Sequence, residues 1–274
     1  MNVQAWIREA TTELVGAGIG TAKLDAELML SHTLRKPRTY LHAHTDDEIS
    51  ERELEIANSR LALRIDRVPL AYILGHKEFY GRRFIVNPSV LIPRPESEAI
   101  IDTLKDLLPD TRALPGHTIR LVDVGTGSGC LGITAKLEFP ELDVTLADIS
   151  RHALKVAEKN TEALHAHVSL LKSDLLQSYV LPPDIIVANL PYVDESWERS
   201  LETNHEPAEA LFARQGGLAF INKLIEQASD VLPMEGLLLL EADPEQHQAI
   251  QAKARVHHLS HVLTRDYCVA YKKD

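Results

Sequence analysis

Apolar residues recur at helical spacing in the first quarter of the chain, and no run there alternates in the manner of a strand. The pattern predicts a small helical bundle over residues 1–68. Asp25 and Glu27 fall within one of the helical stretches, and we expect them to form its solvated edge. The positions that carry the helical spacing are Trp6, Ile7, Leu14, Val15, Leu24, Leu28, Leu34, Leu54, Ala57 and Leu61.

A different pattern surrounds the pair Tyr80-Gly81. Apolar runs at 72–74 and 83–86 flank this pair, which predicts a β-hairpin with the pair at its turn. Three prolines between residues 88 and 95 then stiffen the chain, because each proline fixes its own φ angle. We therefore assign residues 69–92 to a β-hairpin linker.

From residue 93 to residue 274 the chain alternates between short apolar runs and longer helical patterns. Such alternation predicts an α/β domain with a mostly parallel sheet that helices cover on both faces. The expected helices are 130–138, 153–163 and 218–232, and the expected strands are 119–124, 144–147, 168–171, 184–188, 237–241 and 267–271.

The first strands of this domain end in residues suited to a nucleoside. Asp123 precedes Gly125-Thr126-Gly127-Ser128-Gly129, where glycines let the backbone approach a ligand closely, and it is expected to orient that loop. Asp148 ends the next strand, about 20 residues further on, where an acid accepts hydrogen bonds from ribose hydroxyls. Asp174 and Leu175 follow the third strand. Together these strand ends predict a cofactor that contains adenosine.

The fourth strand, 184–188, is followed by Asn189-Leu190-Pro191-Tyr192. An asparagine side chain offers one acceptor and two donors, so it can bind a planar amide or the amino edge of a base. Its place at the end of a buried strand therefore indicates chemistry on a planar nitrogen. The plain alternative is a strand that ends in a proline turn.

These motifs resemble those of the protein-(glutamine-N5) methyltransferases that modify peptide-chain release factors. The segment Ile92-Pro93-Arg94-Pro95-Glu96 discriminates best, because generic S-adenosylmethionine enzymes lack it. Two positions depart from the family pattern: Leu190 replaces the usual proline, and Ala242-Asp243 replaces Ile-Gly. The matching segments are 69–75, 78–81, 90–98, 123–129, 148–150, 173–176, 189–192, 206–207 and 236–241.

The resemblance implies a seven-stranded Rossmann-like class I methyltransferase domain, with its last strand antiparallel, preceded by the helical bundle and the hairpin linker. It implies S-adenosyl-L-methionine as the cofactor, S-adenosyl-L-homocysteine as its product, and class I release factors as protein substrates that the helical domain docks. The residues expected to bind the cofactor are Gly125, Thr126, Gly127, Ser128, Gly129, Asp148, Asp174, Leu175 and Asn189.

The same resemblance implies how the glutamine side chain is held. We expect Asn189 Oδ1 and the Leu190 carbonyl each to accept one N–H of the amide, which stabilises the charge that builds on its nitrogen. Pro191 would fix the backbone, and Tyr192 would form a wall for the flat amide. Arg94 would meet an acidic group at the pocket entrance, or would form a structural ion pair in the linker.

The amino-acid composition disfavours several kinds of partner and bound group. The net charge of −11 over 274 residues, without a long Lys/Arg run, disfavours direct binding to nucleic acid, which needs a basic face. An adenine-N6 methyltransferase of nucleic acid is the alternative, because Asn-Leu-Pro-Tyr also suits an adenine amino group. Two cysteines are too few for a disulfide framework or a zinc site, and no metal is expected.

Without a signal sequence or a membrane-spanning run, the protein is expected to be cytoplasmic. We also expect it to be a monomer. The histidines at 257, 258 and 261 are expected to lie in a solvated strand-like segment rather than to bind a metal.

Overall fold

The computed structural model describes residues 1–108 and 118–274. The chain divides into two compact units. A helical unit comprises Met1–Gly75 together with Arg199–His205, and a catalytic unit comprises His76–Glu198 together with Glu206–Asp274. The helical unit thus runs beyond residue 68 and takes in a short segment from the second half of the chain.

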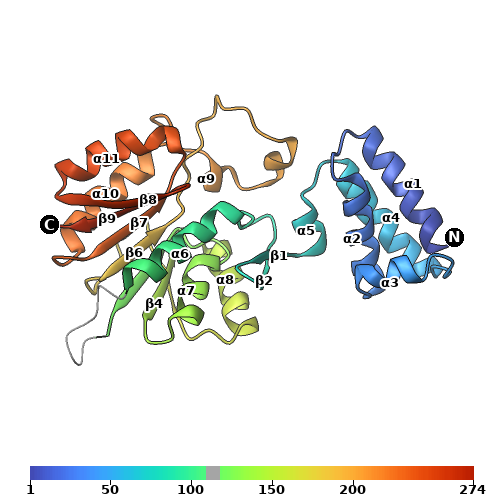
Figure 1. The fold of residues 1–274 in the computed structure, drawn as a ribbon, viewed down its shortest axis with the longest axis horizontal. Helices are drawn as coiled ribbons and strands as arrows, with labels where there is room; N and C mark the ends of the chain where they lie inside the picture. Colours follow the sequence, from blue (N-terminus) through green and yellow to red (C-terminus); the bar gives the residue numbers. More distant parts are fainter. Residues whose placement is uncertain (109–117) are drawn as a thin grey trace. The chain divides into compact units, whose positions relative to one another are not determined.

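Five α-helices form most of the helical unit, and the helical spacing predicted for this region is confirmed (Figure 1). Trp6 and Leu14 are fully buried in its core beside Met29, whereas Val15 and Leu24 are exposed. Asn2 accepts a hydrogen bond from a backbone N–H of the first turn, which explains where the first helix begins. The helices are α1 (Val3–Gly16), α2 (Ala22–Leu34), α3 (Arg38–Ala43), α4 (Glu51–Ile65) and α5 (Leu70–Leu74).

The prediction that Asp25 and Glu27 lie on a solvated edge is wrong. Their exposed fractions are 4% and 2%, and each carboxylate is paired with an arginine. Arg64 Nε donates to Asp25 Oδ2 at 2.7 Å, and Arg38 Nη2 donates to Glu27 Oε2 at 2.6 Å. A charge can be buried when it is paired and hydrogen-bonded, and the pattern within one helix does not reveal such a partner.

The segment Arg199–His205 joins the helical unit through a hydrogen bond to the same arginine, Arg64. Glu202 Oε1 accepts hydrogen bonds from Arg64 Nη1 at 3.0 Å and from Arg67 Nη1 at 3.1 Å. Within this segment lies the short 3-10 helix η3 (Leu201–His205). Arg64 therefore connects α2, α4 and a segment that lies more than 130 residues further along the chain.

The β-hairpin is present in the catalytic unit, but its first strand differs from the prediction. Residues 72–74 belong to α5, and the hairpin consists of β1 (His76–Phe79) and β2 (Arg82–Ile85). The turn is the predicted Tyr80-Gly81, where both residues have positive φ, as a two-residue hairpin of type I′ requires. The short helix ends at Gly75 in the left-handed region, which interrupts the strand that the apolar pattern suggested.

The catalytic unit is built on a seven-stranded sheet with the order β5-β4-β3-β6-β7-β9-β8. The strands pair in parallel except that β9 is antiparallel to both of its neighbours, so the predicted topology is confirmed. The strands are β3 (Arg120–Val124), β4 (Asp143–Asp148), β5 (Ser169–Lys172), β6 (Ile185–Ala188), β7 (Leu237–Glu241), β8 (Leu259–Arg265) and β9 (Cys268–Lys273).

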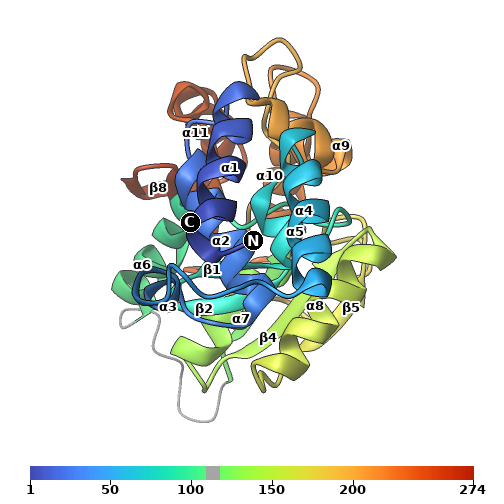
Figure 2. The ribbon, with the colours of Figure 1, turned by 90° about the vertical axis from the view of Figure 1, so that its right-hand side faces the viewer.

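Helices cover both faces of this sheet, with α6, α7 and α8 on one side and α10 and α11 on the other (Figures 1 and 2). Side chains alternate between two cores along each buried strand. Leu121 belongs to the core on the side of α6, α7 and α8, and Val122 belongs to the core on the side of α10 and α11. The helices are η1 (Pro95–Ser97), α6 (Glu98–Leu107), α7 (Cys130–Glu138), α8 (Arg151–Ala163), α9 (Ala208–Leu211), α10 (Ala219–Val231), η4 (Pro244–Gln246) and α11 (His247–Val256).

No helix in the described part of the chain has the length and apolar character that crossing a bilayer would require.

The buried pair in the helical unit yields a stability prediction. Arg64→Met should lower the free energy of unfolding of this unit by about 3–5 kcal/mol, because it leaves the Asp25 carboxylate buried without its partner. Urea unfolding followed by Trp6 fluorescence measures this loss, in a Trp197→Phe background that removes the second tryptophan.

The double variant Asp25→Leu, Arg64→Met is the matched control, because it removes both charges. It should recover most of the lost stability. If it is no more stable than Arg64→Met alone, an unpaired carboxylate is not the cause of the loss.

Candidate active site

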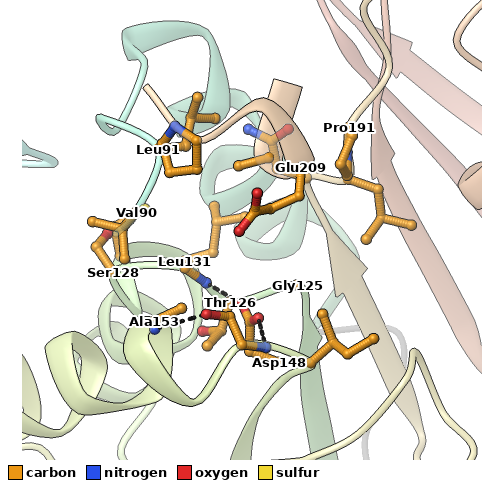
Figure 3. Close-up of a pocket in the computed structure, with 18 of the residues that line it drawn as sticks. Val90, Leu91, Gly125, Thr126, Ser128, Leu131, Asp148, Ala153, Pro191 and Glu209 are labelled. Atoms are coloured by element: carbon orange, nitrogen blue, oxygen red, sulfur yellow. Dashed lines mark hydrogen bonds between the residues drawn. The ribbon is translucent and has the colours of Figure 1, made fainter. Parts of the chain in front are cut away.

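A pocket of about 280 Å³ opens at the carboxyl ends of β3, β4, β5 and β6. Successive strands are added toward one edge of the sheet from β3 to β5, and toward the other edge from β6 onward. The point between β3 and β6 is therefore a topological switch point, where open α/β sheets bind their ligands. Figure 3 shows Asp148 at the base of this pocket, with Val90 and Leu91 on one side and Pro191 on the other. The predicted cofactor-binding residues from all four strand ends line it, except Gly129, which is not among the lining residues.

The glycine loop between β3 and α7 forms part of the pocket wall. Gly125 has a φ of +73°, and a Cβ placed there would lie 2.9 Å from the side chain of Leu190. Gly129 has a φ of +83°, and a Cβ there would lie 2.7 Å from Ile133. Both positions therefore require glycine for conformation and for space, so the loop can lie tightly against β6 and the start of α7.

Asp148 is held by backbone groups of two loops. Its Oδ2 accepts from the Gly127 N–H at 2.9 Å, and its Oδ1 accepts from the Ser150 N–H at 2.8 Å. Burial raises the pKa of Asp148 above its usual value, the backbone donors lower it, and the charge of Glu209 raises it further. Each carboxylate oxygen keeps a further lone pair, so the group can still accept hydrogen bonds from a ligand in the pocket.

Asp123 lies behind the glycine loop and is not among the residues that line the pocket. Its Oδ2 accepts from Thr126 Oγ1 at 2.6 Å and from the Gly132 N–H at 2.9 Å. The carboxylate thereby ties the loop to the first turn of α7. Burial raises its pKa to about 6, against the effect of these two donors.

Asp174 and Leu175 lie in the pocket wall after β5. Asp174 Oδ2 accepts from Lys223 Nζ at 2.7 Å and from Gln177 Nε2 at 3.1 Å. Leu175 is buried and has a φ of +50°, which turns the chain sharply after the strand. The pair therefore presents one apolar side chain and one carboxylate that is already neutralised by a lysine.

In the Asn-Leu-Pro-Tyr segment, Asn189, Leu190 and Pro191 line the pocket, and Tyr192 does not. Asn189 Nδ2 donates to Ser97 Oγ at 2.9 Å, while the Leu190 side chain is buried against the glycine loop. Tyr192 points its hydroxyl to Glu241 Oε1 at 3.0 Å. Burial, followed by the charge of Glu241, raises the pKa of this tyrosine.

Arg94 also lines the pocket, and its Nη2 lies 2.5 Å from Glu206 Oε1. Glu206 is buried, and its other oxygen accepts from the Ile92 N–H at 3.1 Å. Glu206 precedes the short helix α9, so this ion pair ties the Ile92–Glu96 segment to the chain that follows the Asn-Leu-Pro-Tyr segment. The structure thus contains the ion pair that the sequence left open as one of two roles for Arg94.

Three residues of this region carry roles that the sequence did not single out. Ser97 bonds to Asn189, and Glu241 bonds to Tyr192, although both belong to segments that match the family pattern. Glu209 extends its carboxylate from α9 into the pocket (Figure 3). Glu209 comes directly after a Glu-Pro-Ala sequence, and nothing in its local pattern signals that it faces a ligand.

The histidines near the C-terminus do not share one strand. His261 lies in β8, whereas His257 and His258 follow the end of α11. The positive φ of His258 turns the chain between the helix and the strand.

A sheet of this order with a glycine loop and an acid at its switch point defines the class: an α/β methyltransferase. Residues 97–267 match the family described as methyltransferase small domain, and residues 5–75 match the PrmC N-terminal domain. Among solved structures, a methyltransferase from Pyrococcus furiosus superposes with a TM-score of 0.52 at 19% identity, covering 82% of this chain and 99% of that one. This likeness concerns the fold.

The release factor glutamine methyltransferase of Koribacter versatilis is 37% identical over 89% of each chain. That of Bacillus cereus is 34% identical over 78% of this chain and 77% of its own length. The chain therefore belongs to the family of release factor glutamine methyltransferases. A bifunctional methyltransferase of Rickettsia bellii is 32% identical over 97% of this chain, and the chain spans 56% of its length.

The buried carboxyl of Asp123 predicts a specific pH dependence of stability. Its folded pKa of about 6 exceeds the ordinary value of 3.8, so its contribution is complete below about pH 4 and is lost as the pH rises through 6. The loss reaches up to about 3 kcal/mol. In Asp123→Asn this loss is absent, so the stability of the variant relative to the wild type should increase between pH 4.5 and 7.5 in urea unfolding of the cofactor-free protein.

The control for this comparison is Asp143→Asn, which alters an exposed acid at the start of β4. It should leave the pH slope unchanged. Parallel slopes for the wild type and Asp123→Asn would show that Asp123 titrates at the same pH in the folded and unfolded chains.

Proposed function

We propose that this chain transfers a methyl group from S-adenosyl-L-methionine to the side-chain amide nitrogen, N5, of the glutamine in the Gly-Gly-Gln motif of class I release factors. The observation that carries the proposal is the orientation of Asn189. Its amide nitrogen donates to Ser97 Oγ at 2.9 Å and the residue lines the pocket, an arrangement that would leave the amide oxygen to accept from a substrate. The products would be the N5-methylated glutamine and S-adenosyl-L-homocysteine.

The residues of the pocket fit this cofactor. Asp148 would hold the ribose hydroxyls, Leu175 and Asp174 would flank the adenine, and the backbone from Gly125 to Gly129 leaves room for the amino-acid part. When bound, S-adenosyl-L-methionine supplies an electrophilic methyl group on a positively charged sulfonium. Asp148 and Glu209 place negative charge around the pocket that would hold this sulfonium. Arg94 is the one described cation in the pocket wall, and its charge is paired with that of Glu206.

The chain's own groups would prepare the substrate amide. An amide nitrogen is a weak nucleophile, because its lone pair is delocalised into the carbonyl. Asn189 Oδ1 and the Leu190 carbonyl would each accept one N–H of this nitrogen, which orients it and stabilises the positive charge that grows there. Pro191 restricts the backbone that presents the carbonyl. The methylated nitrogen is acidic enough to lose its proton to water, so the reaction needs no dedicated base.

Leu190 is compatible with this role, although the family usually has proline at this position. Only the backbone carbonyl of residue 190 would contact the substrate. The side chain is buried at 4% exposure and contacts the position where Gly125 lacks a Cβ. Leucine therefore serves as packing between β6 and the glycine loop.

We further propose that the helical unit docks the release factor and that the enzyme acts as a monomer in the cytoplasm, where translation terminates. The match of residues 5–75 to the PrmC N-terminal domain supports the docking role. The net charge of −11 favours a protein partner over nucleic acid. The adenine-N6 alternative is disfavoured on the same grounds and by the family to which the chain belongs.

Methyl transfer from labelled S-adenosyl-L-methionine to a purified release factor tests the proposal. Label should enter the intact factor and should be absent from the same factor with its Gly-Gly-Gln glutamine changed to alanine. Ribosomal RNA serves as the competing acceptor. Transfer to the RNA together with none to the factor would identify a nucleic-acid enzyme.

Asn189→Ala should lower kcat on the release factor by about 10²–10³-fold, because it removes one of two acceptors for the substrate nitrogen. The Kd for S-adenosyl-L-methionine, measured by calorimetry, should stay within about tenfold of the wild type. Asp148→Ala is the matched comparison, and it should weaken cofactor binding most. An equal loss of turnover and cofactor affinity in Asn189→Ala would mean that Asn189 shapes the cofactor pocket.

A further inference from the structure

We infer that Ser97 and Glu241 are positioning residues that fix the side-chain amide of Asn189 with its oxygen toward the substrate. The inference rests on the proposed function and deepens it, because it states what makes Asn189 an acceptor. Ser97 and Glu241 lie at separate strand and helix ends, and the fold brings them together behind Asn189.

The strand register explains the juxtaposition. β6 and β7 are parallel neighbours in which Ala188 pairs with Leu240. The next residues, Asn189 and Glu241, therefore emerge side by side at the carboxyl edge of the sheet. Ser97, the last residue of η1, comes from the segment before α6, and its exposed fraction is only 2%. Glu241 is equally buried, with an exposed fraction of 1%.

An amide side chain can be placed in two orientations that differ by half a turn, and its neighbours decide between them. Asn189 Nδ2 donates to Ser97 Oγ at 2.9 Å, and the same side chain lowers the pKa of the neighbouring Glu241 carboxyl. In the opposite orientation the amide oxygen would face a buried carboxylate, and the two oxygens would repel each other. The surroundings therefore favour the orientation that leaves Oδ1 facing the pocket.

The direction of the bonds around Glu241 agrees with this arrangement. A carboxylate can only accept, and Tyr192 Oη donates to Glu241 Oε1 at 3.0 Å. The hydroxyl of Ser97 lowers the pKa of the same carboxyl, and its oxygen accepts a hydrogen bond from Asn189 Nδ2. Ser97 is therefore the acceptor that fixes the amide nitrogen of Asn189.

The carboxyl of Glu241 is buried, although burial disfavours the charged form of an acid. Burial raises its pKa above the usual value, while the side chains of Ser97, Tyr192 and Asn189 lower it and the charge of Glu96 raises it. Tyr192 donates to one oxygen of Glu241, and the other oxygen is buried without a hydrogen-bond partner in the described part of the chain. A buried acid with a raised pKa beside a residue proposed for catalysis is typical of a functional site.

The test compares Ser97→Ala with Ser97→Thr, which keeps a hydroxyl at the same carbon. Ser97→Ala should lower kcat on the release factor by about 10–100-fold, the range seen when a supporting partner of a site residue is removed. The Kd for S-adenosyl-L-methionine should stay within about threefold, and Ser97→Thr should restore kcat to within about threefold of the wild type. Glu241→Gln should lower kcat in the same range.

The double variant Ser97→Ala, Glu241→Gln should lose little more activity than either single variant, because both substitutions release the same amide. A kcat for Ser97→Ala within threefold of the wild type would overturn the inference. So would failure of threonine to restore activity, or a double variant whose losses multiply.

These outcomes are distinct from a failure of the proposed function. If the wild-type enzyme does not methylate the release factor, the proposed substrate is wrong. If the wild type is active and Ser97→Ala is equally active, only the positioning role is wrong.

Discussion

The parallel pairing of β3, β4, β5, β6 and β7 is the constraint on which the rest of the catalytic unit depends. Parallel strands end at one edge of the sheet, so the residues that follow them are gathered there whatever their separation in the sequence. The pairing of β3 with β6 also presses the glycine loop against Leu190, to a distance at which a single added Cβ at Gly125 would collide. The pocket is therefore a direct consequence of strand register.

Among the carboxyl groups that are buried at this edge are Asp123, Asp148 and Glu241. Burial raises the pKa of each, and nearby hydroxyl, amide or backbone donors offset part of the cost of burying charge. Their bonds run mainly to the glycine loop, to the loop after β4 and to the Asn-Leu-Pro-Tyr segment. The same groups that are unfavourable to bury thus hold the loops of the site in fixed positions.

The helical unit is organised by a comparable network around Arg64, which bonds to Asp25 and to Glu202. This network includes the segment Arg199–His205. The residues on both sides of this segment belong to the catalytic unit. The chain that follows the Asn-Leu-Pro-Tyr segment thus contributes to the core contacts of one unit and then, at Glu206, to those of the other. In both cases a glutamate accepts hydrogen bonds from arginine side chains in a partly buried environment.

The sequence by itself determined the α/β alternation, the glycine loop, the acids at the strand ends and the asparagine segment, because these depend on local periodicity and on residue type. Only the tertiary structure decided that Asp25 and Glu27 are buried, that residues 72–74 are helical and that Ser97 supports Asn189. Each of these depends on a partner or a turn outside the local pattern: Ser97 and Asn189 are 92 residues apart. Periodicity shows which face of an element is apolar, whereas the identity of a polar partner is set by the packing of elements that are distant along the chain.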